Sequence, residues 1–369
     1  MEKPFTVLIA CDAFKGSVNQ QDAASAIARG LARGFPGLKV DLCPLADGGE
    51  GSGLIVKSRG GQAFSQVVPD AYGSPHVAEW VYYEGIALVE SAQGSPYVPP
   101  GRRPGSALTT TSRGTGELVS AALGHPNVRE VWVALGGTGC VDGGIGFLGA
   151  LGATFYDRDG RLLDPVVASW ARVEQVVLPP LAKPVVGLSD VWVPLLGEHG
   201  ALRLFGPQKG LRREEVEAAE VALAHFAKAI NPQAASLPGA GAAGGIGFAL
   251  RALGASLRPG AAWFAEWCQL SERMAEADLV VTGEGRLDQQ SLLGKVVSVV
   301  LEESGRQHKP VIALAGEIPD DLSAFYQAGL TSAWPIVPGP VTLEAAVSHT
   351  REWLEAAGER LGRLCAAKI

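Results

Sequence analysis

The sequence of 369 residues has few cysteines, no clustered histidines and no long uncharged apolar run. Its five cysteines never form a CxxC pair, which argues against a disulfide framework and a zinc knuckle. Its six histidines form no HxxxH or HxH pair, so no histidine metal site is predicted. No stretch approaches the ~18 uncharged residues of a membrane span, and the apolar run within residues 1–10 is too short for a secretory signal. We therefore expect a cytoplasmic protein with reduced thiols.

An excess of basic residues is also missing. The chain has 38 acidic and 31 basic side chains and a formal charge of −7, so it lacks the positive field that attracts nucleic acids or anionic membranes. Apolar residues, in contrast, make up 47% of the chain, and there are 48 glycines. This apolar share is sufficient for a buried core and excludes a disordered chain.

Short apolar runs alternate with amphipathic segments at both ends of the chain. Residues 7–11, 21–35 and 40–45 indicate a strand, a helix and a strand, and the last ninety or so residues repeat this pattern, ending in a long helix from Leu343. Residues 65–91 instead carry the turn signals of short antiparallel strands. We predict an α/β protein in which residues 1–61 and 259–369 form one parallel-sheet domain. Residues 62–258 would form an inserted mixed α/β domain, with a cleft where the two domains meet.

Charged side chains follow several of the expected strands, where parallel sheets bind ligands. In the terminal segments these are Asp12 and Lys15 after the first strand, Asp47 and Glu50 after the second, and Glu284, Arg286 and Asp288 after a later strand. A lysine or arginine there can contact phosphate oxygens, and a carboxylate can bind Mg²⁺ or accept a proton. Each pattern is also typical of an ordinary turn with a capping Asp and a solvated lysine.

The middle of the chain carries glycine-rich loops whose main-chain N–H groups can bind phosphate or carboxylate. They are residues 136–144 with Gly137, Thr138 and Asp142, residues 204–210 with Lys209, and residues 238–245 with Gly241 and Gly244. Arg113 follows a run of hydroxyls and can clamp a carboxylate, although a hydroxyl-rich helix start is also typical of capping. The GxGxxG spacing in the third loop follows no expected strand, so it does not predict a dinucleotide-binding fold.

Seven segments, in this order, resemble the motifs of the bacterial glycerate kinase family of the first type: DAFKGS, ADGGEG, TTTSRGTGE, GGTGCVDGG, FGPQKG, GAGAAGG and TGEGRLD. The resemblance covers nearly the whole chain. It implies a flavodoxin-like domain with a second, inserted domain, the use of ATP and Mg²⁺, and phosphorylation of D-glycerate, usually on its 2-hydroxyl. It leaves open whether the protein is a homodimer.

The sequence also departs from the family pattern. Val141 and Val193 stand where the family has asparagines, and Ala13 replaces a serine. The loss of two amides indicates either a different acceptor or weakened catalysis.

The combined hypothesis is phosphoryl transfer, which requires cations for phosphate oxygens, carboxylates for Mg²⁺ and a base near the acceptor hydroxyl. The predicted catalytic residues are Lys15, Asp190, Lys209 and Asp12. The predicted substrate- or phosphate-binding residues are Asp47, Glu50, Arg113, Gly137, Thr138, Asp142, Gly241, Gly244 and Arg286, and the predicted metal ligands are Glu284 and Asp288. The alternatives are a kinase of another small hydroxy acid and a non-catalytic protein that binds an acidic metabolite or nucleotide.

Overall fold

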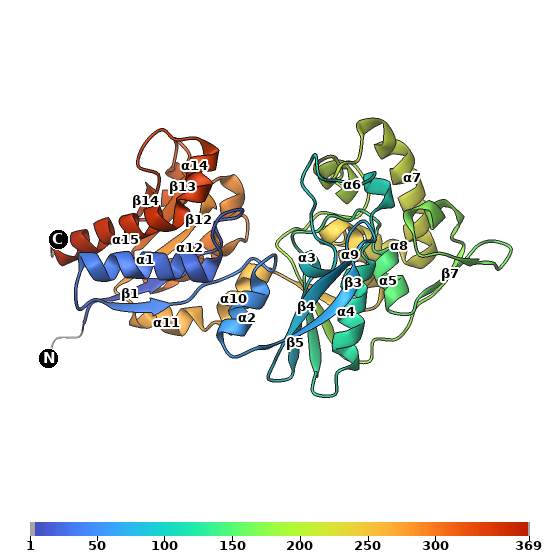
Figure 1. The fold of residues 1–369 in the computed structure, drawn as a ribbon, viewed down its shortest axis with the longest axis horizontal. Coiled ribbons are helices and arrows are strands. Elements are labelled where there is room, and N and C mark those ends of the chain that lie inside the picture. Colours follow the sequence, from blue (N-terminus) through green and yellow to red (C-terminus); the bar gives the residue numbers. More distant parts are fainter. Residues whose placement is uncertain (1–3, 368–369) are drawn as a thin grey trace. The chain divides into compact units, whose positions relative to one another are not determined.

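The computed structural model describes residues 4–367, so residues 1–3 of the N-terminal segment considered above lie outside the described part. The chain forms two compact units (Figure 1). Unit 1 comprises residues 1–47 and 259–369, and unit 2 comprises residues 48–258.

Unit 1 is built on a parallel five-stranded sheet with the strand order β2-β1-β12-β13-β14. The strands are β1 (Thr6–Ile9), β2 (Lys39–Leu42), β12 (Leu279–Arg286), β13 (Val311–Glu317) and β14 (Ser332–Pro335). Renumbered along unit 1, this order is 2-1-3-4-5, which is the flavodoxin-like order. β1 and the first five residues of β12 and β13 are buried, as expected for parallel strands. The predicted flavodoxin-like class is thus confirmed.

The helices of unit 1 include two that come from opposite ends of the chain and pack together, α1 (Gln20–Gly34) and α15 (Thr350–Ala366) (Figure 1). Glycine is required at this contact, because a Cβ on Gly30 would lie 2.0 Å from the Glu355 carbonyl oxygen and one on Gly358 would lie 2.4 Å from that of Ile27. The other helices are α10 (Gly260–Trp267), α11 (Leu270–Glu276), α12 (Val296–Gln307), α13 (Ser323–Gln327) and α14 (Leu343–Ser348).

The long helix predicted from Leu343 is in fact two helices, because α14 ends at Ser348 and α15 begins at Thr350. The Thr350 Oγ1 donates back to the Ala346 carbonyl oxygen at 2.7 Å, a bond that commonly bends helices. The Val347 carbonyl oxygen lies in the last turn of α14 and accepts a hydrogen bond from the Ser17 Oγ at 2.6 Å, so it has a partner outside the helix.

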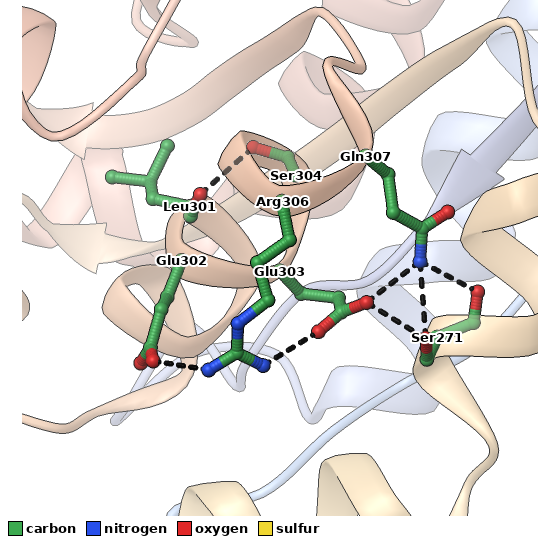
Figure 2. Close-up of polar contacts among 7 residues, drawn as sticks. All are labelled: Ser271, Leu301, Glu302, Glu303, Ser304, Arg306 and Gln307. Carbon is green, nitrogen blue, oxygen red and sulfur yellow. Dashed lines mark hydrogen bonds and ion pairs between the residues drawn. The ribbon is translucent and has the colours of Figure 1, made fainter.

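α12 is held firmly at its C-terminal end (Figure 2). Arg306 pairs with Glu302 and Glu303 on α12 itself. The Gln307 Nε2 donates to the carbonyl oxygen of Ser271 on α11 at 3.0 Å. The Gln307 contact ties this end of α12 to α11, and the N-terminal end of α12 lies at the candidate site described below.

Unit 2 is built on a mixed six-stranded sheet with the order β3-β4-β5-β6-β10-β11. The strands are β3 (Gln62–Pro69), β4 (Pro75–Tyr83), β5 (Ile86–Glu90), β6 (Glu130–Ala134), β10 (Val185–Leu188) and β11 (Ser256–Arg258). β3, β4 and β5 pair antiparallel, which confirms the prediction for residues 65–91, whereas β5, β6, β10 and β11 pair parallel. The inserted unit is therefore mixed α/β, as predicted.

The remaining elements of unit 2 complete its core. The helices are α2 (Ser52–Ser58), α3 (Ser91–Gly94), α4 (Arg113–Gly124), α5 (Ile145–Ala150), α6 (Ala201–Phe205), α7 (Arg213–Ile230), α8 (Pro232–Ser236) and α9 (Ile246–Ala252). A small antiparallel sheet consists of β7 (Thr154–Tyr156), β8 (Leu162–Leu163) and β9 (Gln175–Val177). The first boundary lies before the predicted Gly61, because α2 packs against β4 and β5.

Two expectations from composition concern the whole chain. All five cysteines are unpaired, and four of them are buried. Within residues 4–367, no helix combines the length and the hydropathy that crossing a bilayer requires.

Candidate functional site

Unit 1 contains a cavity of about 760 Å³ at the carboxyl ends of β12, β13 and β14, beside the loop that follows β1. Its charged part is lined by Lys15, Glu284, Arg286, Lys295 and Glu317, and its apolar part by Phe14, Ile336, Val337, Pro340, Val341, Leu343, Ala346 and Val347. The chain order of the sheet reverses between β1 and β12, and doubly wound sheets bind ligands outside the carboxyl ends of such strands. The cavity therefore lies where this fold binds ligands.

Three of the predicted residues form a charged cluster beside this cavity. The Lys15 Nζ donates to the Asp47 Oδ2 at 2.7 Å. Asp12 is only 4% exposed, and its Oδ1 accepts the Ala13 amide at 2.7 Å. Burial, followed by the charge of Asp47, raises the pKa of Asp12 to about 8. Asp12 therefore binds its proton more tightly than an ordinary aspartate does.

Glu284 presents a carboxylate oxygen that lacks a partner. Its Oε1 is buried and has no hydrogen-bond partner among the described residues, and burial raises its pKa. Because β12 continues through Arg286, Glu284 and Arg286 lie on the same side of the strand, and both line the cavity, as the alternation predicted. Arg286 also pairs with Glu317 at 3.3 Å.

Asp288 occupies a structural position. It caps the short 3-10 helix Gln289–Leu292, with its Oδ1 accepting the Gln290 amide at 2.8 Å, and it does not line the cavity. Within residues 4–367, no three His, Cys, Asp or Glu side chains form a metal site by themselves. Mg²⁺ at kinase sites usually takes only one or two carboxylates together with phosphate oxygens and water. The unpartnered oxygen of Glu284 fits this donor set better than the capping carboxylate of Asp288.

The N-terminal end of α12 adds positive charge to the same cavity. Lys295 precedes the helix and lines the cavity, and its side chain does not cap the first turn. The first amides of a helix have no intrahelical partner, and the helix dipole is positive there. Lys295 was not among the predicted site residues, although its position just after Gly294 and before a helix was a usable signal.

Unit 2 contains a second cavity, of about 440 Å³. It lies at the carboxyl ends of β6 and β10, and its lining residues are Tyr97, Leu135, Gly136, Gly137, Thr138, Val191, Phe205, Gln208, Lys209, Ala243 and Gly244. All three predicted glycine-rich loops thus contribute to one cavity. The predicted residues that line it are Gly137, Thr138, Lys209 and Gly244.

Lys209 is a buried cation in this cavity. Its Nζ donates to the Thr138 Oγ1 at 3.1 Å and to the Cys140 carbonyl oxygen at 2.9 Å. Burial lowers its pKa, and within the described chain it forms no salt bridge. The amides of residues 136–138 likewise have no hydrogen-bond acceptor in the part that the structure describes. Because a buried charge normally has a partner, one ammonium and several free amides make this cavity suited to an anion.

Two predicted binding residues, Asp142 and Arg113, lie outside the cavity. The Asp142 carboxylate is fully buried and accepts the Ser112 amide at 2.7 Å, the Ser112 hydroxyl at 2.8 Å, and the amides of Gly144 and Gly146. Arg113 pairs with Glu117 at 2.7 Å and lines a different cavity. Neither Asp142 nor Arg113 lines the cavity of Lys209, although the negative charge of Asp142 acts on the Lys209 ammonium.

The other predicted residues of unit 2 lie beside the cavity. A Cβ on Gly137 would lie 3.7 Å from the Glu50 side chain, and Asp190 immediately precedes Val191 of the lining. Gly241 packs against the backbone of residue 194, since a Cβ there would lie 2.4 Å from the Pro194 carbonyl oxygen.

The two valines that replace family asparagines do not line the cavity. Val141 is 2% exposed in the core of unit 2, and its amide donates to the Thr110 Oγ1 at 3.0 Å. Val193 contacts the third glycine-rich loop through its backbone, because its carbonyl oxygen accepts the Gly241 amide at 3.0 Å. Both departures therefore fall in the supporting structure.

Glu90, at the end of β5, is a buried acid that was not among the predicted site residues. It is 7% exposed, and its Oε1 accepts the Gly53 amide in the first turn of α2 at 2.5 Å. Burial raises its pKa to about 7, and the Gly53 bond offsets part of this effect. Glu90 thus ties α2 to the sheet.

The raised pKa of Glu90 gives a testable pH dependence. Because the folded-state pKa exceeds the ordinary value of 4.5, the folded state binds more protons, and stability falls as pH rises from about 4.5 to about 7. We expect Glu90→Gln to be nearly neutral at about pH 5 and to raise the free energy of unfolding at about pH 8 by up to about 3 kcal/mol. Denaturant unfolding followed by circular dichroism measures this, with the exposed Glu198→Gln as the control. An equal effect of Glu90→Gln at both pH values would contradict the assignment.

The fold defines a class of protein, a flavodoxin-like α/β unit with an inserted mixed α/β unit, each with a cavity suited to anions. The model of the glycerate kinase family matches residues 7–366, so the chain belongs to this family. It is 36% identical to the glycerate kinase of Bacillus subtilis (strain 168), with 98% of this chain and 97% of that protein aligned. It is 35% identical to the glycerate 2-kinase of Escherichia coli (strain K12), with 92% of each chain aligned.

A solved structure gives the same result for the fold. The crystal structure of a protein from Salmonella typhimurium LT2, assigned as glycerate kinase 2, superposes with a TM-score of 0.83 at 33% identity and covers 99% of each chain. The similarity extends over both units and confirms the resemblance inferred from the seven motifs.

Proposed function

We propose that the protein is an ATP-dependent kinase that transfers a phosphoryl group to the 2-hydroxyl of D-glycerate. Family membership supports the reaction class, and the name of the Escherichia coli relative supports the 2-hydroxyl. The single observation that carries the proposal is the charged half of the unit 1 cavity. There three cationic side chains and the start of α12 adjoin a carboxylate oxygen without a partner.

We assign the nucleotide to the unit 1 cavity. Lys15, Arg286 and Lys295 would contact phosphate oxygens, and the apolar half of the cavity would receive the base and sugar. Glu284 would hold Mg²⁺ together with the phosphates, and the ion would neutralise charge that develops during transfer. Asp47 would keep Lys15 in place through the 2.7 Å ion pair.

We assign the carboxylate of the acid to the unit 2 cavity. Lys209 and the free amides of residues 136–138 would bind it, in a site that already excludes most water from the ammonium. Asp190 and Asp12 would serve proton transfer, and the raised pKa of Asp12 makes it a stronger base than an ordinary aspartate. Since Val141 and Val193 lie outside the lining, they give no reason to replace D-glycerate as the acceptor.

The test is an assay of the purified protein with ATP, Mg²⁺ and D-glycerate. We expect release of ADP that depends on D-glycerate, and 2-phosphoglycerate as the product identified by phosphorus NMR. A panel of other small hydroxy acids runs in parallel. ADP release with a different acid, and not with D-glycerate, would show that this acid is the acceptor. ATP binding without ADP release under any condition would show that the protein is a non-catalytic binding protein.

A further inference from the structure

Two side chains, Tyr97 and Arg103, connect two segments in the wall of the unit 2 cavity, and we call this pair the brace. The amide of Tyr97 donates to the Gly137 carbonyl oxygen at 3.0 Å, and the Tyr97 hydroxyl donates to the Gln208 carbonyl oxygen at 3.2 Å. Tyr97 therefore joins the first glycine-rich loop to the residue immediately before Lys209. Its ring lines the cavity between these two attachments.

Arg103 reinforces the same connection. Its Nη2 donates to the Tyr97 hydroxyl at 3.2 Å and also to the Gln208 carbonyl oxygen, and its Nε donates to the Val98 carbonyl oxygen at 2.9 Å. Its guanidinium carbon lies 5.6 Å from the centre of the Tyr97 ring, within the range of a cation–π contact.

Arg103 contacts the chain on both sides of Lys209. A Cβ on Gly210 would lie 2.9 Å from the Arg103 Nη1, and Gly210 has a φ of +97°, so glycine fits this position for two reasons. Arg103 thus hydrogen-bonds to residue 208 and lies close to residue 210, while the Lys209 ammonium donates to Thr138.

We propose that Tyr97 and Arg103 are positioning residues that fix the Lys209 ammonium against the amides of residues 136–138. The proposal rests on the assignment of the unit 2 cavity to the acid substrate. The Lys209 ammonium and the amides of residues 136–138 come from segments about seventy residues apart in the chain. The distance between them therefore depends on contacts that connect the two segments, and the brace provides such contacts. Neither Tyr97 nor Arg103 belongs to a recognisable sequence motif, since both residues lie in an irregular segment.

The first test compares Tyr97→Phe, Arg103→Met and the double variant with wild type. We expect the KM for D-glycerate to rise about fivefold in Tyr97→Phe and about tenfold in Arg103→Met, with kcat and the KM for ATP nearly unchanged. In the double variant, the KM for D-glycerate should rise by less than the product of the two single increases, because both side chains act through the same Gln208 carbonyl oxygen. Arg102→Met is the matched control, because Arg102 is an exposed neighbour whose side chain forms no hydrogen bond or ion pair in the described chain.

A second measurement does not depend on turnover. Competitive acetylation with acetic anhydride, read by mass spectrometry, reports how accessible and how basic each lysine is. We expect acetylation of Lys209 to increase at least fivefold in Tyr97→Phe and Arg103→Met, because a loosened wall admits the reagent to an amine that is only 7% exposed in the wild type. The exposed Lys228 on α7 should be unchanged.

The two tests separate failure of the proposal from failure of the proposed function. Unchanged Lys209 labelling in both variants, or a rise in KM for D-glycerate and ATP alike, would overturn the brace even in an active kinase. A wild-type protein without turnover would overturn the kinase assignment, and the labelling experiment would still decide whether the brace holds Lys209.

Discussion

We expect Lys209→Met to reduce kcat/KM for D-glycerate by about a thousandfold. Removing one partner of a buried, hydrogen-bonded charge pair typically costs 2–5 kcal/mol or more, and a thousandfold corresponds to about 4 kcal/mol. Methionine fills a similar volume, so the fold of unit 2 should be kept. Steady-state kinetics measure the effect, and Lys228→Met, on the exposed face of α7, is the matched control. An effect of less than threefold would remove Lys209 from the acid-binding site.

The same residue predicts a pH dependence. Burial lowers the pKa of Lys209 below the ordinary 10.5 of lysine, so the ammonium loses its proton at a lower pH than an exposed lysine does. We expect kcat/KM for D-glycerate to fall on the alkaline side as this positive charge is lost. Lys209→Arg keeps the charge at all accessible pH values, so its alkaline decline should move to higher pH even if its activity is reduced. An unchanged alkaline limb would assign the decline to another group.

The second large effect is expected for Glu284→Gln, with kcat reduced about a hundredfold or more and the Mg²⁺ concentration for half-maximal activity raised at least tenfold. The amide lacks the negative charge that holds a hard cation, whereas the buried position and the size of the side chain are retained. Glu302→Gln on the solvent side of α12 is the control, because that side chain is 67% exposed and, within residues 4–367, its one ion pair is with Arg306.

Glu284→Asp provides a further comparison within the same site. It keeps the charge but shortens the side chain, so part of the Mg²⁺ dependence should return. If Glu284→Gln showed the wild-type Mg²⁺ dependence, Glu284 would have no role in metal binding.

The sequence was informative wherever a site residue follows directly from a strand. β1 and β12 were recognisable as buried apolar runs, and the carboxyl ends of neighbouring parallel strands must lie together, so Lys15, Glu284 and Arg286 could be placed beside one cavity in advance. The same logic placed Thr138 after β6. These predictions needed only strand identity and direction.

The predictions that the structure does not support concern residues whose roles depend on partners distant in sequence. Asp142 has the residue type and the glycine-rich surroundings of an anion site, yet its carboxylate serves Ser112, thirty residues away in the chain. Asp288 caps a short helix that the sequence did not indicate. Tyr97 and Arg103 belong to no motif, because an irregular segment carries no periodicity from which side-chain direction can be inferred.

The pairing of α1 with α15 has a consequence for biosynthesis. All of unit 2 leaves the ribosome before the second half of unit 1 has been translated. β1, an interior strand of the first sheet, therefore cannot pair with β12 until β12 has been synthesised, and α1 cannot pack against α15 until synthesis is nearly complete. Premature termination between residues 259 and 335 would thus yield a polypeptide with every residue of the Lys209 cavity but without the residues from Ile336 onwards that line the unit 1 cavity.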